Sequence, residues 1–447
     1  RVVEKSKCCL LKVIMATGDK YINVNIYLHK QGFVPAGIIT FNDKKNYSTF
    51  SYFKEYKIKD YPSLNPATLN YKENRHNTFI FHKEENSHML DKTFWELLPQ
   101  PSDWGTQVLI SKYPKYEYLN YLEKLFFLGK RTVGGLEIFV KEKIEEENIT
   151  SKTWLDSVRE ESIEFHLKNI EKFSSDFIIN PLSSYGGARP KCTFKDELGQ
   201  YWIAKFNLPR DVYNMAIGEH IALEMAKDVG LNCAETKVLK LASGESVFLS
   251  KRFDRVNEER KHSLSLFALS NKTNQNKSKS FFGNSTEVIK TIINRYSDFE
   301  DMDTVNVVVK LLLDLAVNNT DNHLRNLRLI LNNNNKWEFS PIYDVVFNPY
   351  SQNFIYNPAG LDLSDLYLTN PQLAEKLSKE FNLDIDLITE KIEKVISVAK
   401  NWESYCDKYD LSSEDKLKIG QAVNLGLYRK DLDVHIENKI LKNKKLI

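Results

Sequence analysis

The stretch NNTDNHLRN at residues 318–326 places an aspartate, a histidine and four asparagines directly after the apolar run VNVVVKLLLDLAV at residues 305–317. The apolar run has the composition of a buried helix. Asn and Asp end helices and form turns readily, but a turn needs only one or two such residues. The remaining polar side chains therefore indicate a functional site, and the residues that follow them decide the fold.

The residues after this stretch predict a hairpin that returns the chain to it. Residues 327–331 (LRLIL) form an apolar strand, the four asparagines at 332–335 form the turn, and residues 336–339 form the second strand. Asp344 follows the second strand, so the hairpin brings it back toward Asp321 and Asn326. Three oxygen-bearing side chains are expected to meet there.

Such a set of side chains suits phosphoryl transfer from a nucleotide. One carboxylate orients the attacking hydroxyl and accepts its proton, while a carboxamide and a second carboxylate hold Mg²⁺, which prefers hard oxygen ligands. Asp321 and Asn326 have the D-x-x-x-x-N spacing of kinase catalytic loops, and Asp344 follows at the place of the metal-binding aspartate. The alternative, in which Asn319, Asp321 and Asn326 only cap the helix and form turns, leaves Asp344 unexplained.

The chain from residue 181 onward predicts an antiparallel sheet with one helix against it, in the order strand, strand, helix, strand, strand, with Gly230 as the helix C-cap. In YWIAKF at residues 201–206, alternation places Lys205 on a strand face where its ammonium group needs a partner. Glu219 on the next helix supplies that partner, which predicts a Lys–Glu pair directed at ATP phosphates. Alternatively, Lys205 extends to solvent from the strand end.

The loop YGGARPK at residues 185–191 is predicted to lie against the phosphates, because glycines let the backbone approach closely. An ordinary turn is the alternative. The segment VFLSKRFDR at residues 247–255 is predicted as the adenine-binding hinge, with Phe248 or Phe253 against the base, although aromatic residues there can equally belong to the core. The predicted ATP-binding set is Lys205, Gly186, Gly187, Ala188, Arg189, Lys191, Glu219, Lys251, Phe253 and His323. His323 has a structural alternative, because Asp321 already supplies the base.

Composition limits the function classes. The chain has 447 residues, of which 42% are hydrophobic and 27% charged, as in ordinary soluble globular proteins. Its 62 Lys and Arg against 60 Asp and Glu give a net charge of +2, which does not supply the basic surface that direct nucleic-acid binding needs. The five cysteines suit neither a disulfide framework nor a zinc site. These features predict a reduced, cytoplasmic protein without membrane spans.

With these motifs in hand, the chain resembles the HipA-type kinases, which are bacterial serine/threonine protein kinases that act as toxins of toxin–antitoxin pairs. The matching segments follow the family order over most of residues 20–350: IYLHKQGFVPAGIITF (26–41), LPQPSDWG (98–105), LGKRTVGGLEIF (128–139), SSYGGARPK (183–191), WIAKF (202–206), SKRFDR (250–255), NNTDNHLRN (318–326) and WEFSPIYDV (337–345).

The resemblance implies an α+β, two-lobed, protein-kinase-like fold with a β-rich N-lobe, an extra N-terminal subdomain and an all-helical C-lobe. The expected division is a tag or non-native leader at residues 1–14, the N-terminal subdomain at 15–140, the nucleotide-binding lobe at 141–260 and the helical catalytic lobe at 261–447. By position, Asp321 is then the catalytic base, Asn326 and Asp344 bind Mg²⁺, and Lys205 contacts the phosphates of ATP.

The resemblance also implies regulation and partners. Ser184, with Ser183 adjacent, matches the serine whose autophosphorylation silences the family's enzymes. The implied partners are a HipB-like DNA-binding antitoxin and a protein substrate such as an aminoacyl-tRNA synthetase. The chain departs from the family in KLLLDLA before the catalytic loop and in VVFNPYSQ after Asp344. Two other hypotheses stay open: a corepressor subunit with vestigial catalysis, and a HipA-fold kinase of a lipid head group, small molecule or other non-toxin substrate.

Overall fold

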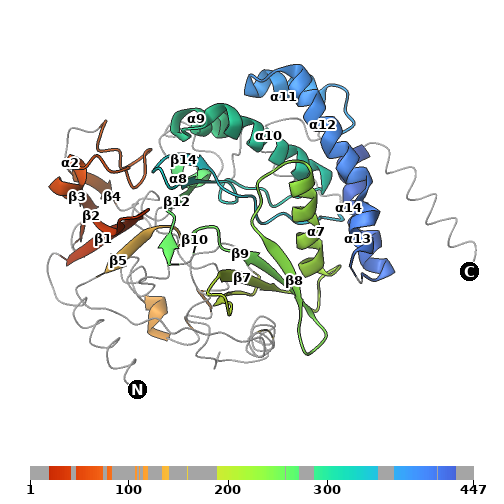
Figure 1. The fold of residues 1–447 in the computed structure, drawn as a ribbon, viewed down its shortest axis with the longest axis horizontal. Helices are drawn as coiled ribbons and strands as arrows, with labels where there is room; N and C mark the ends of the chain where they lie inside the picture. Colours follow the sequence, from red (N-terminus) through yellow and green to blue (C-terminus); the bar gives the residue numbers. More distant parts are fainter. Residues whose placement is uncertain are drawn as a thin grey trace, which may run out of the picture. The chain divides into compact units, whose positions relative to one another are not determined.

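The computed structural model describes residues 20–41, 47–73, 78–82, 106–107, 110, 114–118, 133–139, 159, 189–256, 258–270, 286–350, 367–409 and 411–428 (Figure 1). The chain divides into two compact units. The first takes residues 1–203, 252–275 and 329–337, and the second takes residues 204–251, 276–328 and 338–447. Each unit is therefore built from several separate stretches of the sequence.

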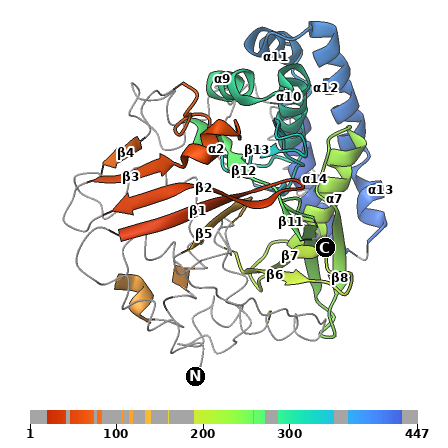
Figure 2. The same cartoon turned by 60° about the vertical axis from the view of Figure 1, so that its left-hand side comes forward.

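An antiparallel sheet of order β4-β3-β2-β1-β5 forms the N-terminal part of the first unit (Figure 2). Its strands are β1 (Lys20–Leu28), β2 (Gly32–Phe41), β3 (Tyr47–Tyr52), β4 (Thr78–His82) and β5 (Leu136–Phe139). Polar and apolar residues alternate around a glycine in residues 21–41, a pattern typical of a hairpin, and β1 and β2 form that hairpin. Alternate residues of β1, among them Val24 and Ile26, are buried, so this sheet turns one face to a core.

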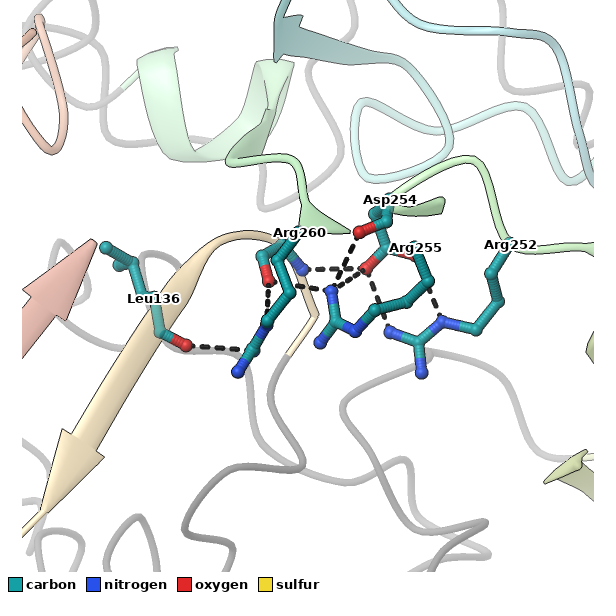
Figure 3. A network of polar contacts seen from close by, with 6 residues as sticks. Leu136, Arg252, Asp254, Arg255 and Arg260 are labelled. Carbon is teal, nitrogen blue, oxygen red and sulfur yellow. Dashed lines mark hydrogen bonds and ion pairs between the residues drawn. The ribbon is translucent and has the colours of Figure 1, made fainter. Parts of the chain in front are cut away.

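A buried cluster of charges joins this sheet to the segment that follows β9 (Figure 3). Arg252 donates two hydrogen bonds to Asp254, at 3.0 and 2.9 Å, and Arg255 donates a third at 3.0 Å. The Gly134 amide, just before β5, donates to the same carboxylate at 2.8 Å, and Arg260 donates to the Gly134 carbonyl at 3.1 Å. Burial alone would raise the pKa of Asp254, but the two arginines outweigh it and hold the pKa well below its usual range.

The predicted order of strand, strand, helix, strand, strand is confirmed after residue 190. These elements are β6 (Lys191–Lys195), β7 (Tyr201–Phe206), α7 (Met215–Asp228), β8 (Thr236–Lys240) and β9 (Ser246–Lys251). The four strands form a sheet of order β6-β7-β9-β8, and the division between the units falls within β7. Helix α7 ends at the C-cap Val229, and Gly230 follows with a φ of 97°, a conformation that glycine adopts without strain.

Helices dominate the second unit. They are α9 (Thr286–Tyr296), α10 (Glu300–Ala316), α11 (Leu373–Phe381), α12 (Ile385–Lys400), α13 (Trp402–Asp407) and α14 (Ser413–Tyr428). The buried helix predicted at 305–317 is confirmed as α10, which packs against α9, α12 and α14 and buries Val308 and Leu312 completely. The predicted hairpin is confirmed as β13 (Arg328–Leu331) and β14 (Trp337–Phe339), next to β12 (Ser263–Ser265).

Short elements complete the described parts of the chain. They are α2 (Lys54–Ile58), η1 (Pro114–Tyr118), β10 (Arg255–Val256), β11 (Glu259–Arg260) and α8 (Leu266–Leu269). The sequence has helical spacing of apolar residues at 113–130 and 151–173 and a polar segment typical of a loop at 270–280. Of these three segments only the 3₁₀ turn η1, residue 159 and Ser270 are among the described residues. In the described ranges, no helix is long and apolar enough to cross a bilayer.

Candidate active site

Lys205 on β7 is the centre of the site in the second unit. Its ammonium nitrogen lies 2.7 Å from Oε1 of Glu219 and also donates to Oδ1 of Asp344. The same nitrogen lies 5.6 Å from the centroid of the Phe248 ring. Burial by itself would lower the pKa of Lys205, but the carboxylates of Asp344 and Glu219 outweigh burial and raise it. Lys205 therefore stays protonated, and the Lys–Glu pair predicted from the sequence is present.

The start of α7 fixes the position of Glu219. The side chain of the N-cap residue Asn214 accepts a hydrogen bond from the Ile217 amide at 3.2 Å and another from Nδ2 of Asn207 at 2.9 Å. Asn207 in turn accepts from the Ala216 amide at 2.9 Å. Glu219 follows one turn into this capped helix and is 5% exposed, so it faces Lys205 from a rigid element.

The segment that carries Asp344 is held on both sides. Before it, Ile342 exchanges backbone hydrogen bonds with the segment just before β8, at 2.8 Å to the Asn232 carbonyl and 3.0 Å from the Ala234 amide. After it, the carbonyl of Phe347 accepts from the Tyr213 hydroxyl at 2.8 Å. Asp344 itself has a φ of 59°. A left-handed conformation costs a non-glycine residue about 1 kcal/mol or more and persists where the surroundings impose it, often at functional sites.

The predicted catalytic loop begins where α10 ends. Asn318 adopts a left-handed conformation with a φ of 51°, and its side chain donates to the Asn348 carbonyl at 2.7 Å. Within the loop, Nδ2 of Asn326 donates to the Asp321 carbonyl at 2.8 Å, which closes the five-residue spacing into a turn. The Asp321 carboxylate is 71% exposed. It is therefore accessible to a substrate hydroxyl, as a base must be.

Two hydrogen bonds join the catalytic loop to the Asp344 segment. The Tyr343 hydroxyl donates to the Arg325 carbonyl at 3.1 Å, and Nδ2 of Asn348 donates to the Thr320 hydroxyl at 2.7 Å. The first bond joins the sequence neighbours of Asp344 and Asn326, and the second joins Asn348 to the residue before Asp321. The approach of the two segments that the hairpin predicted is thus present in the structure.

The chemistry of these donors fits a magnesium ion. Asn326 uses its amide nitrogen within the loop, so its carboxamide oxygen is the atom that would face a cation. The Asp344 carboxylate is 33% exposed and would be the second ligand, with Lys205 competing for one of its oxygens. In the described part of the chain, no three His, Cys, Asp or Glu side chains gather as a metal cluster. Mg²⁺ in proteins usually has only one or two carboxylate ligands, and waters and phosphate oxygens supply the rest of its coordination.

The remaining residues of the predicted ATP-binding set lie partly in the first unit, partly in the second and partly outside the described residues. Arg189, the buried Lys191 and the half-buried Phe253 belong to the first unit, while Lys251 in the second pairs with Glu235 at 3.0 Å. The backbone amides of Lys251 and Arg252 are used in hydrogen bonds within the sheet, so a base contact there would use carbonyl groups. The loop residues lie outside the described residues: Ser183, Ser184, Gly186, Gly187 and Ala188.

His323 lies beside Asp321 without a direct hydrogen bond between their side chains. Its Nε2 is 3.8 Å from Oδ1 of Asp321, and its Nδ1 is buried without a hydrogen-bond partner among the described residues. The backbone of His323 contributes more, because its amide donates to the Asp321 carbonyl at 3.1 Å and its carbonyl accepts from the Asn326 amide at 2.8 Å. These contacts favour the structural alternative for His323.

Two features of the site were missed from the sequence. One is the direct contact between Lys205 and Asp344, which are 139 residues apart in the chain. The other is a buried ion pair of Lys310 and Asp314 below the catalytic loop, which continues to Asn319. The Lys310–Asp314 pair could have been found from the sequence, because two opposite charges lie four residues apart within an apolar helical run.

Part of the chain is similar to a known family in sequence, and most of the chain is similar to a solved protein in structure. Residues 183–402 match the sequence profile of the HipA-like C-terminal domain. The structure is similar to HipA from Shewanella oneidensis, solved in a complex with HipB and operator DNA, with a TM-score of 0.58 and 15% identity over 92% of this chain and 100% of that chain. It is also similar to the proinflammatory kinase CtkA from Helicobacter pylori, with a TM-score of 0.38 and 15% identity over 56% and 95% of the two chains. No curated protein matches the sequence. The Shewanella match confirms the HipA-like α+β fold predicted from the sequence.

Proposed function

The chain is a HipA-like protein, and from that premise we propose that it is an ATP- and Mg²⁺-dependent protein kinase. The observation that carries the proposal is the position of Lys205 between Glu219 and Asp344, whose segment is hydrogen-bonded to the loop of Asp321 and Asn326. The Lys205 ammonium group is paired with Glu219 and also contacts Asp344. In this position it can bind phosphate oxygens next to a metal ion held by Asp344.

Each residue has a distinct role in this proposal. Asp321 orients the acceptor hydroxyl and takes its proton, while Lys205, oriented by Glu219, binds the phosphates. Asn326 and Asp344 would hold Mg²⁺, which neutralises charge that develops on the transferred phosphoryl group. The protein contributes positioning and electrostatic stabilisation, and these account for most of the catalysis of phosphoryl transfer.

The finer parts of the proposal come from the family likeness. We propose a serine or threonine acceptor on a protein, such as an aminoacyl-tRNA synthetase, and a role as the toxin of a toxin–antitoxin pair. Autophosphorylation at Ser184 or Ser183 would place a phosphate in a sequence that also contains Arg189 and Lys191, to which it could bind. The Shewanella HipA was solved with HipB and operator DNA, which supports a HipB-like antitoxin as partner. Contact with DNA would then be made through that partner.

The test is intact-mass spectrometry of the full chain after incubation with Mg²⁺ and ATP. We expect a mass gain of one phosphate in the wild type and in Asp301→Asn, a control at an exposed position of α10. We expect no gain in Asp321→Ala, because the base is missing. A gain that persists in Asp321→Ala would contradict the assignment of the base.

A wild type that gains no phosphate calls for two further measurements, nucleotide binding and transfer of labelled phosphate from ATP to proteins of a lysate. Binding without any transfer would contradict the kinase proposal and favour the corepressor alternative. Transfer to a lysate protein that Asp321→Ala does not support would retain the kinase proposal and reject self-phosphorylation.

A further inference from the structure

Helix α10 contains an ion pair that is almost completely buried. Lys310 is 1% exposed and Asp314 is 5% exposed. The ammonium nitrogen of Lys310 lies 2.6 Å from Oδ1 and 2.5 Å from Oδ2 of Asp314, one helical turn further on. Neighbouring residues such as Leu312 and Leu313 are fully buried, so this pair lies within the apolar core of the unit.

Stability alone is a weak explanation for this pair. Removing two charges from water costs several kcal/mol per ion, and replacing a buried pair by apolar residues of similar volume is often neutral or stabilising. The pair must also be kept together, because removal of one member leaves an uncompensated buried charge. The Asp314 carboxylate has a further partner besides Lys310.

Asn319 connects Asp314 to the catalytic loop. Its Nδ2 donates to Oδ1 of Asp314 at 2.9 Å, and its backbone amide donates to the Asp314 carbonyl at 2.8 Å. Its own Oδ1 accepts a hydrogen bond from the Asp321 amide at 3.2 Å. Asn319 is 4% exposed, so its carboxamide is confined to this orientation.

The exposed carboxylate of Asp321 needs such support. With 71% of its side chain exposed, packing does little to fix it. Its backbone is also held, because the amide is bound to Asn319 and the carbonyl to the side chain of Asn326. Phosphoryl transfer is sensitive to such placement, since a displacement of about 1 Å can cost about a hundredfold in rate.

We propose that Asp314 and Asn319 are positioning residues that hold Asp321 in place, with Lys310 as the ion-pair partner of Asp314 inside α10. The inference rests on the proposed kinase function for its catalytic consequence. Its structural part, the restraint of the Asp321 amide, stands independently of that function.

A matched pair of double variants tests the inference. Lys310→Met/Asp314→Asn and Lys310→Met/Asp314→Leu both remove the ion pair without leaving an unpaired charge. Only the first keeps an oxygen at position 314 that can accept from Asn319. Asn319→Ala is a third variant, which removes the connection at its other end if the Leu variant fails to fold.

Two readouts are measured on the full chain, after thermal unfolding has shown that each variant is folded. The first is amide hydrogen exchange of residues 318–326. We expect exchange about tenfold faster in the Leu and Ala variants and close to the wild-type rate in the Asn variant. The second is ADP release with Mg²⁺ and ATP. We expect kcat to fall about tenfold to a hundredfold in the Leu and Ala variants, with KM for ATP little changed.

Equal exchange rates in the Leu and Asn variants, together with equal kcat values, would overturn the inference. Equal values are expected if Asp314 only fills space in the core, because the Asn and Leu side chains have the same branched shape. Of the two, only Asn keeps an oxygen that can accept from Asn319. A wild type that releases no ADP, even when a lysate supplies acceptor proteins, would reject the proposed kinase function, while the exchange comparison would still decide whether Asp314 and Asn319 restrain Asp321.

Discussion

Lys205 determines the charge balance of the candidate site, because its ammonium group faces the carboxylates of Glu219 and Asp344. One positive charge between two negative ones leaves the group with a net negative charge. That arrangement keeps Lys205 protonated and keeps one Asp344 oxygen engaged until a competing ligand binds. Nucleotide phosphates would attract Lys205 away from Asp344 and free that oxygen for the metal.

Replacing Lys205 should therefore change metal and nucleotide affinity in opposite directions. In Lys205→Met the two carboxylates lose their cation, so the Kd for Mn²⁺ in the absence of nucleotide should fall about tenfold. The Kd for ATP should rise about tenfold, since a charge-assisted hydrogen bond is lost. Mn²⁺ binding can be followed by electron paramagnetic resonance and ATP binding by calorimetry.

The control is Lys416→Met, which removes a lysine paired at 2.8 Å with the exposed Asp407. Neither affinity should change in this variant, because exposed pairs contribute little. An unchanged Mn²⁺ affinity in Lys205→Met would show that Lys205 does not compete with a metal ion for Asp344.

At the scale of elements, α7 positions both partners of Lys205. It carries Glu219, and the preceding residue Gly218 leaves room for the ring of Tyr213, whose hydroxyl holds the Phe347 carbonyl three residues after Asp344. A Cβ added at Gly218 would lie 2.4 Å from Cε2 of Tyr213. The glycine thus lets one aromatic side chain connect the helix to the Asp344 segment.

Gly218→Ala should destabilise the protein even though alanine favours helices. The intrinsic gain is about 0.5–1 kcal/mol, whereas forcing the Tyr213 ring aside should cost about 1–3 kcal/mol. Urea unfolding measures the balance. In the double variant Gly218→Ala/Tyr213→Leu the clash is relieved, so the two changes should be coupled by about 1 kcal/mol or more. Additivity within about 0.5 kcal/mol would argue against this packing role.

At the scale of the whole molecule, buried charge is used differently in the two units. In the second unit it surrounds the candidate site, as the contacts of Lys205 and Asp314 show. In the first unit, Asp254 accepts hydrogen bonds from Arg252, Arg255 and the Gly134 amide, and so connects segments that are 120 residues apart. The first unit should therefore depend on Asp254 for stability.

Asp254→Asn should reduce the free energy of unfolding by about 3 kcal/mol at neutral pH, because it removes one partner from a buried charge cluster. Glu258→Gln is the control in the same unit, since that carboxylate is 84% exposed and pairs with Lys195 at 3.1 Å. Its effect should stay below about 0.5 kcal/mol. Urea unfolding at neutral pH compares the two variants.

The stabilisation that Asp254 provides should also depend on pH. The folded pKa of Asp254 lies below its unfolded value of 3.8, so its stabilisation is complete above that pH and is lost as the pH falls toward the folded pKa. The difference between wild type and Asp254→Asn should therefore shrink below about pH 4. A difference that stays constant from about pH 7 to about pH 3 would mean that the Asp254 charge does not stabilise the fold.

Local patterns determined much of this structure. Alternation in residues 201–206 placed Lys205 on the half-buried face of β7, and the asparagines at 332–335 formed the turn of the predicted hairpin. The buried helix α10 and the C-terminal position of Gly230 on α7 also followed from the sequence. These features are predictable because strand and helix periods and turn preferences depend on residues a few positions apart.

The sequence by itself therefore determined the fold class, the D-x-x-x-x-N motif and the Lys205–Glu219 pair. Only the tertiary structure decided that Asp344 also binds Lys205, that Asp254 collects two arginines and the Gly134 amide, and that Asp314 supports Asn319. The contacts of Asp344 with Lys205 and of Asp254 with the Gly134 amide join residues more than a hundred positions apart, so no local pattern encodes them. The third is close in sequence but depends on burial, because water would otherwise satisfy both partners and remove the reason for them to meet.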